Sequence, residues 1–174
     1  MRSPLVTGED GLARCWWGAS TPDYQCYHDQ EWGRPVTDDR GLYERLTLEA
    51  FQSGLSWLTI LRKREGFRAA FAGFEIERVA AFGDRDFERL MADASIVRNR
   101  LKIEAAIANA RALEAMHRAG ESLAEVVWAH RSTDPLPAPA TLDDLPGSTP
   151  GSKLLAKQLK ARWRTAREQR HPLD

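Results

Sequence analysis

The chain has 174 residues, 43% of them hydrophobic, which is enough for one domain with a substantial core. Its 25 Lys and Arg residues balance 25 Asp and Glu residues, so no global field marks a nucleic-acid-binding protein. No run of residues approaches the ~18 apolar residues of a membrane span, and residues 1–11 lack the apolar core of a signal peptide. We therefore expect a soluble, cytoplasmic protein that does not bind membranes.

Helical periods recur along the chain and strand signals are almost absent, so the sequence predicts an all-α protein. Residues 1–11 are expected to form a loose, flexible leader. The two cysteines, Cys15 and Cys26, are expected to be reduced thiols because no secretory signal accompanies them. The motifs GxGxxG, GxSxG and HExxH and the Walker loop do not occur, so the classes that depend on them are unsupported.

Residues 15–33, CWWGASTPDYQCYHDQEWG, have an unusual composition. They contain three of the six tryptophans, two of the three tyrosines, both cysteines and one of the four histidines. They contain no Leu, Ile or Val, which a packed core would favour. The segment therefore predicts a place where planar aromatic faces meet a flat ligand, with a soft metal ligand nearby.

A helix is predicted from Arg40 to about Ser53, because Thr37, Asp38 and Asp39 supply N-cap chemistry before it. Its apolar stripe runs through Leu42 and Leu46 and then reaches Glu49, which would place a carboxylate on the buried face. Such an acid is either paired inside the fold or part of a functional site, where perturbed acids concentrate.

Gly54 is expected to break or bend this helix. If the helix continues past it, Glu49 and Trp57 are eight residues apart and could line two sides of one pocket.

Short helices are predicted around residues 76–82 and 84–92, followed by a long helix that starts near Ser95 and ends at Gly120. Its buried stripe is expected to include Ile103, Ile107 and Ala110. Three cations crowd its start and oppose the helix dipole, so they are expected to meet an anion or a loop carbonyl: Arg98, Arg100 and Lys102.

Residues 134–141 are expected to be a connecting loop, and a Gly/Pro turn from Leu145 is expected to open a helix. Turns of this kind expose backbone N–H groups that can bind a phosphate, although many helix starts look similar. From Lys153 to Arg170 there are seven Lys or Arg residues and one Glu, which form either a solvated helix face or a phosphate-binding one.

Four stretches together resemble one known family: RCWWG at Arg14, YQCYHDQEWGRP at Tyr24, LEAFQSGLSWLTILRKRE at Leu48 and IVRNRLKIEAAIANAR at Ile96. In this order and spacing they are similar to the bacterial DNA-3-methyladenine glycosylase I family, from about Arg14 to about Arg162. The resemblance implies a helix-hairpin-helix DNA glycosylase fold over residues 12–162, followed by a divergent basic tail at residues 163–174.

The resemblance also implies roles for matching residues. The base pocket would be formed by Trp17, Tyr24, Tyr27 and Trp57, with Glu49 as its catalytic carboxylate. A hairpin that grips one DNA strand would comprise Gly147, Ser148, Thr149, Gly151, Ser152 and Lys153. The implied activity is hydrolytic excision of 3-methyladenine from double-stranded alkylated DNA by a monomeric enzyme. The implied alternative is a catalytically impaired lesion-binding protein that lacks the family's C-terminal element.

Cys15 and His28 match the first half of the family's structural zinc site, which suggests Zn²⁺ as a cofactor. The family's other two ligands, a late His and a late Cys, have no match here. A complete site would need another partner, such as Cys26 or His171. A small zinc-dependent interaction domain is therefore a third interpretation. The two remaining histidines, His117 and His130, are expected on ordinary helix surfaces.

Overall fold

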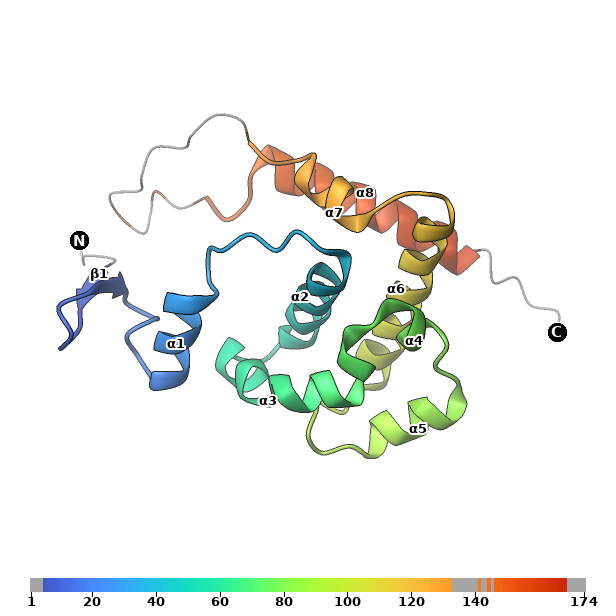
Figure 1. The fold of residues 1–174 in the computed structure, drawn as a ribbon, viewed down its shortest axis with the longest axis horizontal. Coiled ribbons are helices and arrows are strands. Elements are labelled where there is room, and N and C mark those ends of the chain that lie inside the picture. The colour runs from blue at the N-terminus through green and yellow to red at the C-terminus, as the bar shows by residue number, and fades with distance from the viewer. Residues whose placement is uncertain (1–4, 133–140, 142–143, 145, 169–174) are drawn as a thin grey trace.

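The computed structural model describes residues 5–132, 141, 144 and 146–168, with the backbone alone from residue 163 onward. Helices dominate these residues and confirm the all-α prediction (Figure 1). The helices are α1 (Pro22–Gln30), α2 (Asp39–Gln52), α3 (Trp57–Ala70), α4 (Ile76–Ala80), α5 (Asp84–Ala92), α6 (Arg100–Arg118), α7 (Leu123–Trp128) and α8 (Pro150–Glu168), with a short 3-10 helix, η1 (Ala72–Phe74). Among the residues described, no helix has the length and apolar character to cross a membrane.

A small antiparallel hairpin precedes the helices. Its strands are β1 (Leu5–Thr7) and β2 (Ala13–Cys15), paired with Leu5 opposite Cys15. The expectation of a loose leader over residues 1–11 is therefore wrong for residues 5–7, while residues 1–4 lie outside the described part. The hairpin closes because Gly11 adopts a φ of 76° and the Arg14 guanidinium donates hydrogen bonds to Asp10 across the turn.

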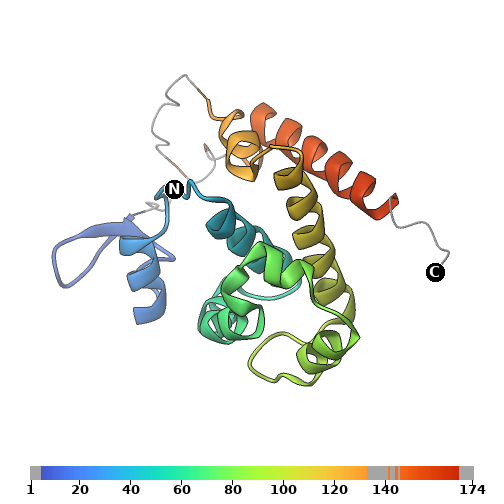
Figure 2. The same cartoon turned by 45° about the vertical axis from the view of Figure 1, so that its right-hand side comes forward.

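The main core lies among α2 to α8, at one side of α1 and the hairpin (Figure 2). A row of phenylalanine rings from α2, α3 and η1 fills its centre, with Phe51, Phe67, Phe71 and Phe74 almost fully buried. Helix α6 packs against both α4 and α8, and α8 adds Leu159 to the same core. This core holds α2 and α3 in fixed positions.

Helix α6 buries Ile103, Ile107 and Ala110, as its sequence period predicts. It begins at Arg100, five residues later than expected, because Asn99 is its N-cap and accepts a hydrogen bond from the Lys102 amide. Gly120 follows its end with a φ of 75°, as expected of a C-terminal glycine.

Helix α2 starts where its cap residues predict: Asp38 is the N-cap and accepts a hydrogen bond from the Gly41 amide at 2.8 Å. It ends at Gln52, and Gly54 with a φ of 83° turns the chain before α3 begins at Trp57. One continuous helix through these positions is therefore not formed.

Lys102 of α6 fixes the turn between α2 and α3. Its Nζ donates to the carbonyl oxygens of Phe51 at 2.8 Å and Ser53 at 2.6 Å. The cations at the start of α6 were expected to meet an anion or a loop carbonyl, and Lys102 binds carbonyl oxygens. Its positive charge also complements the negative end of the α2 helix dipole.

The buried stripe of α2 differs from the predicted one. Tyr43, Thr47 and Phe51 lie four residues apart and face the core, whereas Leu42 and Leu46 are only partly buried. Since each residue advances the helix by about 100°, Glu49 lies on nearly the opposite side from that stripe. The prediction that Glu49 occupies the buried face is therefore wrong, because the larger aromatic residues take the core side.

Helix α8 continues to Glu168, past the predicted boundary at residue 162. It is tied to the preceding segment by an ion pair between Arg162 and Glu121 and by a 2.7 Å hydrogen bond between Gln158 and His130. His130 therefore makes a specific contact in the turn after α7, unlike the plain surface position expected for it. Most of the predicted loop at 134–141 lies outside the described residues.

Candidate functional site

A pocket of about 230 Å³ lies between α1 and the facing ends of α2 and α3. Its walls come from seven residues: Trp17, Tyr24, Tyr27, Trp32, Glu49, Gln52 and Trp57. Ligand pockets commonly span ~300–1,000 Å³, so this volume suits a group no larger than about one base. All five residues predicted for a base pocket thus meet in one place.

Two lining residues, Trp32 and Gln52, were not predicted from the sequence. Trp32 belongs to the aromatic-rich segment 15–33, and its 49% exposure leaves the ring available to a ligand. Gln52 lies three residues after Glu49 on α2, so the same helix face carries both side chains. The spacing from Glu49 was the available signal for Gln52.

Helix α1 places Tyr24 and Tyr27 on one face, three residues apart. Thr21 caps the helix by accepting a hydrogen bond from the Tyr24 amide at 3.2 Å. The Tyr24 hydroxyl in turn accepts a 3.0 Å hydrogen bond from the Leu58 amide, one of the first N–H groups of α3. Its hydroxyl is therefore occupied by the fold, and its ring serves as a wall.

Trp17 is the centre of the aromatic cluster. Its ring lies edge-on to Tyr24, with centroids 5.6 Å apart, and to Trp32, with centroids 5.2 Å apart. The neighbouring Gly18 lets the chain approach His28, since a Cβ there would lie 2.7 Å from the imidazole ring. These edge contacts hold the pocket rings in place before any ligand binds.

Trp57 closes the opposite wall as the first residue of α3, with its ring centroid 5.7 Å from that of Tyr27. Its indole N–H is buried and has no hydrogen-bond partner among the described residues. A buried donor without a partner is costly and marks a position where a ligand acceptor would be favourable.

Glu49 carries the only formal charge among the lining residues. No described residue donates a hydrogen bond to it, although its side chain is open to solvent through the pocket mouth. Partial burial among the rings raises the pKa of Glu49, and the Arg45 guanidinium opposes that rise. The pocket thus offers one carboxylate that accepts no hydrogen bond from the described residues, beside five aromatic rings, an arrangement suited to a flat cation.

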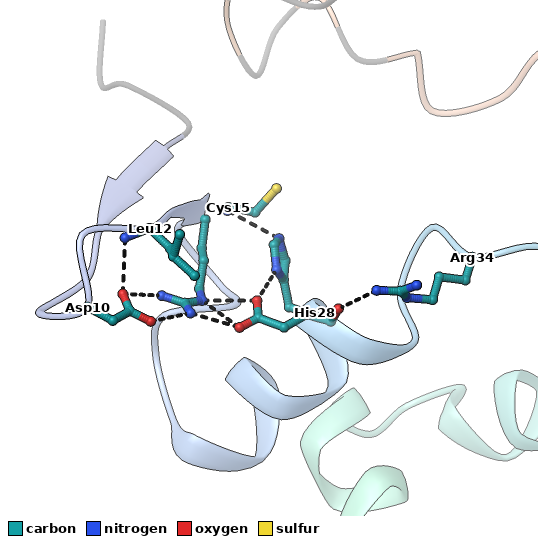
Figure 3. A network of polar contacts seen from close by, with 7 residues as sticks. Asp10, Leu12, Cys15, His28 and Arg34 are labelled. Atoms are coloured by element: carbon teal, nitrogen blue, oxygen red, sulfur yellow. Dashed lines mark hydrogen bonds and ion pairs between the residues drawn. The ribbon is translucent and has the colours of Figure 1, made fainter.

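The predicted metal ligands Cys15 and His28 lie close together, in contact through the Cys15 backbone amide (Figure 3). The His28 ring centroid lies 5.2 Å from that of Trp17 in the pocket wall. Asp29 accepts from His28 Nδ1 at 3.0 Å and is itself held by Arg14, so the lone pair of His28 resides on Nε2. That nitrogen accepts a long, 3.4 Å hydrogen bond from the Cys15 amide. In the part of the chain that the structure describes, no third His, Cys, Asp or Glu joins them to form a metal-binding group.

Cys26 does not complete this pair. It is exposed and lies two residues before His28 on α1, which turns its side chain by about 200°. His171, the other proposed partner, lies outside the described residues.

The predicted DNA-binding segment forms the start of α8, far along the chain from the pocket. Thr149 and Ser152 cap each other: the Ser152 amide donates to Thr149 Oγ1 at 3.1 Å and the Thr149 amide to Ser152 Oγ at 2.9 Å. Two of the expected phosphate-binding amides are therefore engaged. The amides of Gly147, Ser148 and Gly151 have no acceptor among the described residues, and Lys153 is exposed.

An all-α protein with one carboxylate in an aromatic pocket is the class that this fold and site define. A sequence model of the family described as methyladenine glycosylase matches residues 16–165, most of the chain. The chain belongs to the methyladenine glycosylase family.

Two curated relatives share this family. DNA-3-methyladenine glycosylase 1 of Escherichia coli is 46% identical over 152 residues, which cover 87% of this chain and 81% of the relative. DNA-3-methyladenine glycosylase of Haemophilus influenzae is 38% identical over 150 residues, which cover 86% and 81%.

Solved structures agree with the fold. A crystal structure of 3-methyladenine DNA glycosylase I matches with a TM-score of 0.80 at 49% identity, covering 86% of this chain and 82% of that one. The Staphylococcus aureus enzyme, in a structure concerned with 3-methyladenine recognition, matches with a TM-score of 0.79 at 34% identity, covering 88% and 82%.

Proposed function

We propose that this protein is a DNA repair enzyme that flips 3-methyladenine out of alkylated DNA and hydrolyses its N-glycosidic bond. The observation that carries the proposal is a single carboxylate, Glu49, in a pocket of aromatic rings whose volume suits one base. The family membership and the relatives that act on 3-methyladenine support the same activity.

The chemistry of the substrate explains why so few reactive groups are needed. Methylation at N3 gives adenine a positive charge, weakens its bond to deoxyribose and makes it a good leaving group. The protein therefore has to provide access and discrimination more than acid catalysis. Flipping the nucleotide costs a few kcal/mol, and a damaged base pair reduces that cost. Water then attacks the sugar as the base departs.

Discrimination follows from the pocket walls. Trp and Tyr faces attract a cationic purine more than a neutral one, by ~0.5 to 2 kcal/mol per contact as the cation desolvates. Glu49, when ionised, accepts hydrogen bonds from the base and opposes its charge. Unmodified adenine would leave the partly buried carboxylate imperfectly paired, so the same group rejects the normal base.

The start of α8 supports a second contact, with the phosphate backbone of double-stranded DNA. The amides of Gly147, Ser148 and Gly151 have no acceptor among the described residues there, and Lys153 adds a positive charge. This is the hairpin role that the sequence suggested, with Thr149 and Ser152 now shaping the turn by capping each other. We propose further that the enzyme is a monomer and acts in the cytoplasm.

A zinc ion is the proposed cofactor, held by Cys15 and His28, with His171 as the further partner that the sequence offers. The residue types fit one half of a tetrahedral site, and Asp29 orients the His28 ring; metal binding would replace the long hydrogen bond from the Cys15 amide to Nε2. The ion would have a structural role and tie the hairpin to α1. We expect purified protein to contain about one zinc ion per chain and C15S to contain none; metal analysis checks this, and metal-free wild-type protein contradicts it.

Release of free base from DNA treated with a methylating agent tests the enzymatic proposal. We expect wild-type protein to release 3-methyladenine and Glu49→Gln to release it about ten- to hundredfold more slowly, because charged hydrogen bonds to the base are lost. Glu88→Gln, at an exposed position on α5, is the matched control and should retain wild-type release.

The release assay, together with binding of free 3-methyladenine, tests the alternative of a lesion-binding protein without turnover. That alternative is supported if wild-type protein binds free 3-methyladenine, Glu49→Gln binds it more weakly, and neither protein releases base from DNA. Equal release by wild type and Glu49→Gln would contradict the role of Glu49.

A further inference from the structure

Arg45 lies directly behind the pocket wall without lining the pocket itself. It faces a second hollow of about 240 Å³, which adjoins the first because Tyr27 and Trp32 line both. From there the guanidinium approaches Tyr27 and lies one helical turn before Glu49 on α2. We propose that Arg45 is a positioning residue that keeps Glu49 ionised and makes the Tyr27 hydroxyl a donor to the base. This inference rests on the proposed function.

The contacts of Arg45 link α2 to α1. Its Nη1 donates to the Tyr27 hydroxyl at 3.4 Å, its Nη2 donates to Glu31 Oε2 at 3.2 Å, and its Cζ lies 5.8 Å from the centroid of the Tyr27 ring. The planar fork of an arginine can span two such acceptors, which a lysine ammonium cannot do in the same geometry. Arg45 thus sets the position of the Tyr27 ring and hydroxyl together.

The direction of this hydrogen bond decides what Tyr27 can offer. An arginine has donors only, so the Tyr27 oxygen must act as the acceptor and its own proton must point elsewhere. Burial raises the pKa of Tyr27, so the hydroxyl keeps that proton at neutral pH. Because Tyr27 lines the pocket, a ring-nitrogen acceptor of a bound purine can receive this proton. Arg45 therefore turns Tyr27 into a hydrogen-bond donor for the ligand.

Arg45 also favours the ionised form of Glu49. The ionisable groups that face Glu49 are Tyr24 and Tyr27 from α1 and Arg45 from α2, while α3 contributes the uncharged Trp57. Arg45 is the only cation among them, and its attraction favours the ionised carboxylate that burial disfavours. Without it, the carboxylate would take up a proton at a higher pH and lose its attraction for a cationic base.

These roles can be separated from folding. In a variant without Arg45, Glu31 keeps two hydrogen bonds to Arg64, at 2.6 and 2.8 Å, so the end of α1 remains attached to α3. The Arg45 side chain is 31% exposed and lies outside the main core. Its replacement by Met should therefore leave the fold intact.

The test compares Arg45→Met and Arg45→Lys with wild-type protein. Arg68→Met is the matched control, because Arg68 forms an ion pair between α3 and Glu44 of α2 without touching the pocket. For each protein, base release is measured under single-turnover conditions over a range of pH, and Glu49 is titrated in the free protein by carbon NMR of its carboxyl group.

In Arg45→Met we expect the Glu49 titration and the acid limb of base release to move to higher pH. Release at neutral pH should also fall about three- to tenfold, since Tyr27 loses the partner that directs its proton. Arg45→Lys keeps the charge, so its acid limb should stay near that of wild type while the loss at neutral pH persists. Arg68→Met should match wild type in both measurements.

A double-mutant cycle with Tyr27→Phe tests the second role directly. If Arg45 acts through the Tyr27 hydroxyl, Arg45→Met should cause little further loss at neutral pH in a protein that already lacks this hydroxyl. Additive losses overturn the link to Tyr27, and an unchanged Glu49 titration in Arg45→Met overturns the link to Glu49. Wild-type protein that releases no base overturns the proposed function instead, while the NMR titration still decides whether Arg45 controls Glu49.

Discussion

At the scale of single residues, Asp39 shows how much one carboxylate can connect. It was expected as part of the cap of α2, but the structure makes Asp38 the cap and gives Asp39 another role. Its two oxygens accept four hydrogen bonds of 2.7–2.8 Å from α6 and the start of α7, donated by His117, Ser122, Leu123 and Ala124. His117 is thus a partner in a network, which corrects its expected place on an ordinary helix surface.

The network fixes the charge of Asp39. Burial alone would raise the pKa of Asp39, but the hydrogen bonds from Ala124, His117, Leu123 and Ser122 outweigh it and lower the pKa below its ordinary value. A carboxyl group with a lowered pKa in the folded state stabilises the fold above its unfolded-state pKa. That contribution is lost as the pH falls through the folded-state value.

We expect Asp39→Asn to reduce the free energy of unfolding at pH 7 by about 2 kcal/mol, because charged acceptors for the first amides of α7 are lost. The difference from wild type should shrink as the pH is lowered below the ordinary pKa of an aspartate. Urea denaturation at several pH values measures it. Asp84→Asn, at an exposed position in α5, should change stability by less than about 0.5 kcal/mol. A deficit in Asp39→Asn that does not vary with pH contradicts the argument.

At the scale of elements, α8 has two different faces. Leu155 and Leu159 pack toward the core, whereas Lys153, Lys157 and Lys160 are exposed and lie four and three residues apart on one side. The basic C-terminal arm was expected to be either a solvated helix face or a phosphate-binding one. Within the part of α8 whose side chains are described, this question concerns the row of three lysines. Its first member, Lys153, lies close in the chain to the helix-start amides that have no acceptor within the described part of the chain, which favours phosphate binding.

We expect the triple variant Lys153→Gln, Lys157→Gln, Lys160→Gln to bind duplex DNA more weakly and with less dependence on salt. Each lost phosphate contact should reduce the slope of log K against log[salt] by about 0.9. Fluorescence anisotropy of a labelled duplex over a range of salt concentrations measures the slope.

A matched triple variant removes three exposed arginines from other helices: Arg78→Gln, Arg85→Gln, Arg118→Gln. It should retain the wild-type slope. Equal reductions in both triple variants would indicate a general charge effect and leave the lysine row without a specific role.

At the scale of the whole molecule, the pocket lies at a junction between two parts that are held together differently. Helices α2 to α8 share the main core, but α1 and the hairpin contribute nothing to it. Polar contacts attach α1 to α3 instead: ion pairs of Asp23 with Arg62 and of Glu31 with Arg64, and the hydrogen bond from Leu58 to Tyr24. Because four of the pocket rings lie in or beside α1, whereas Trp57 and Glu49 belong to the other part, the fit of the site depends on these contacts.

The local sequence determined several of these features by itself. Helical periods predicted the all-α class and the buried residues Ile103, Ile107 and Ala110, because a repeat of about 3.6 residues directs side chains to one face. The capping chemistry before α2 and the turn at Gly54 are equally local. The residues of the base pocket were inferred from aromatic composition and family resemblance, and all of them line one pocket.

Only the tertiary structure decided which face of α2 is buried. The sequence stripe through Leu42 and Leu46 placed Glu49 in the core, but the phenylalanine-rich core takes Tyr43 and Phe51 instead. Glu49 then faces α1, a helix that contributes no residue to the main core. The pairing of β1 with β2 and the place of Trp32 in the pocket wall were also visible only in the structure. The same holds for the hydrogen bond from Arg45 to Tyr27, which joins α2 to α1. A helical period defines possible faces, whereas the neighbours that pack against the helix determine which face meets the core and which meets the ligand.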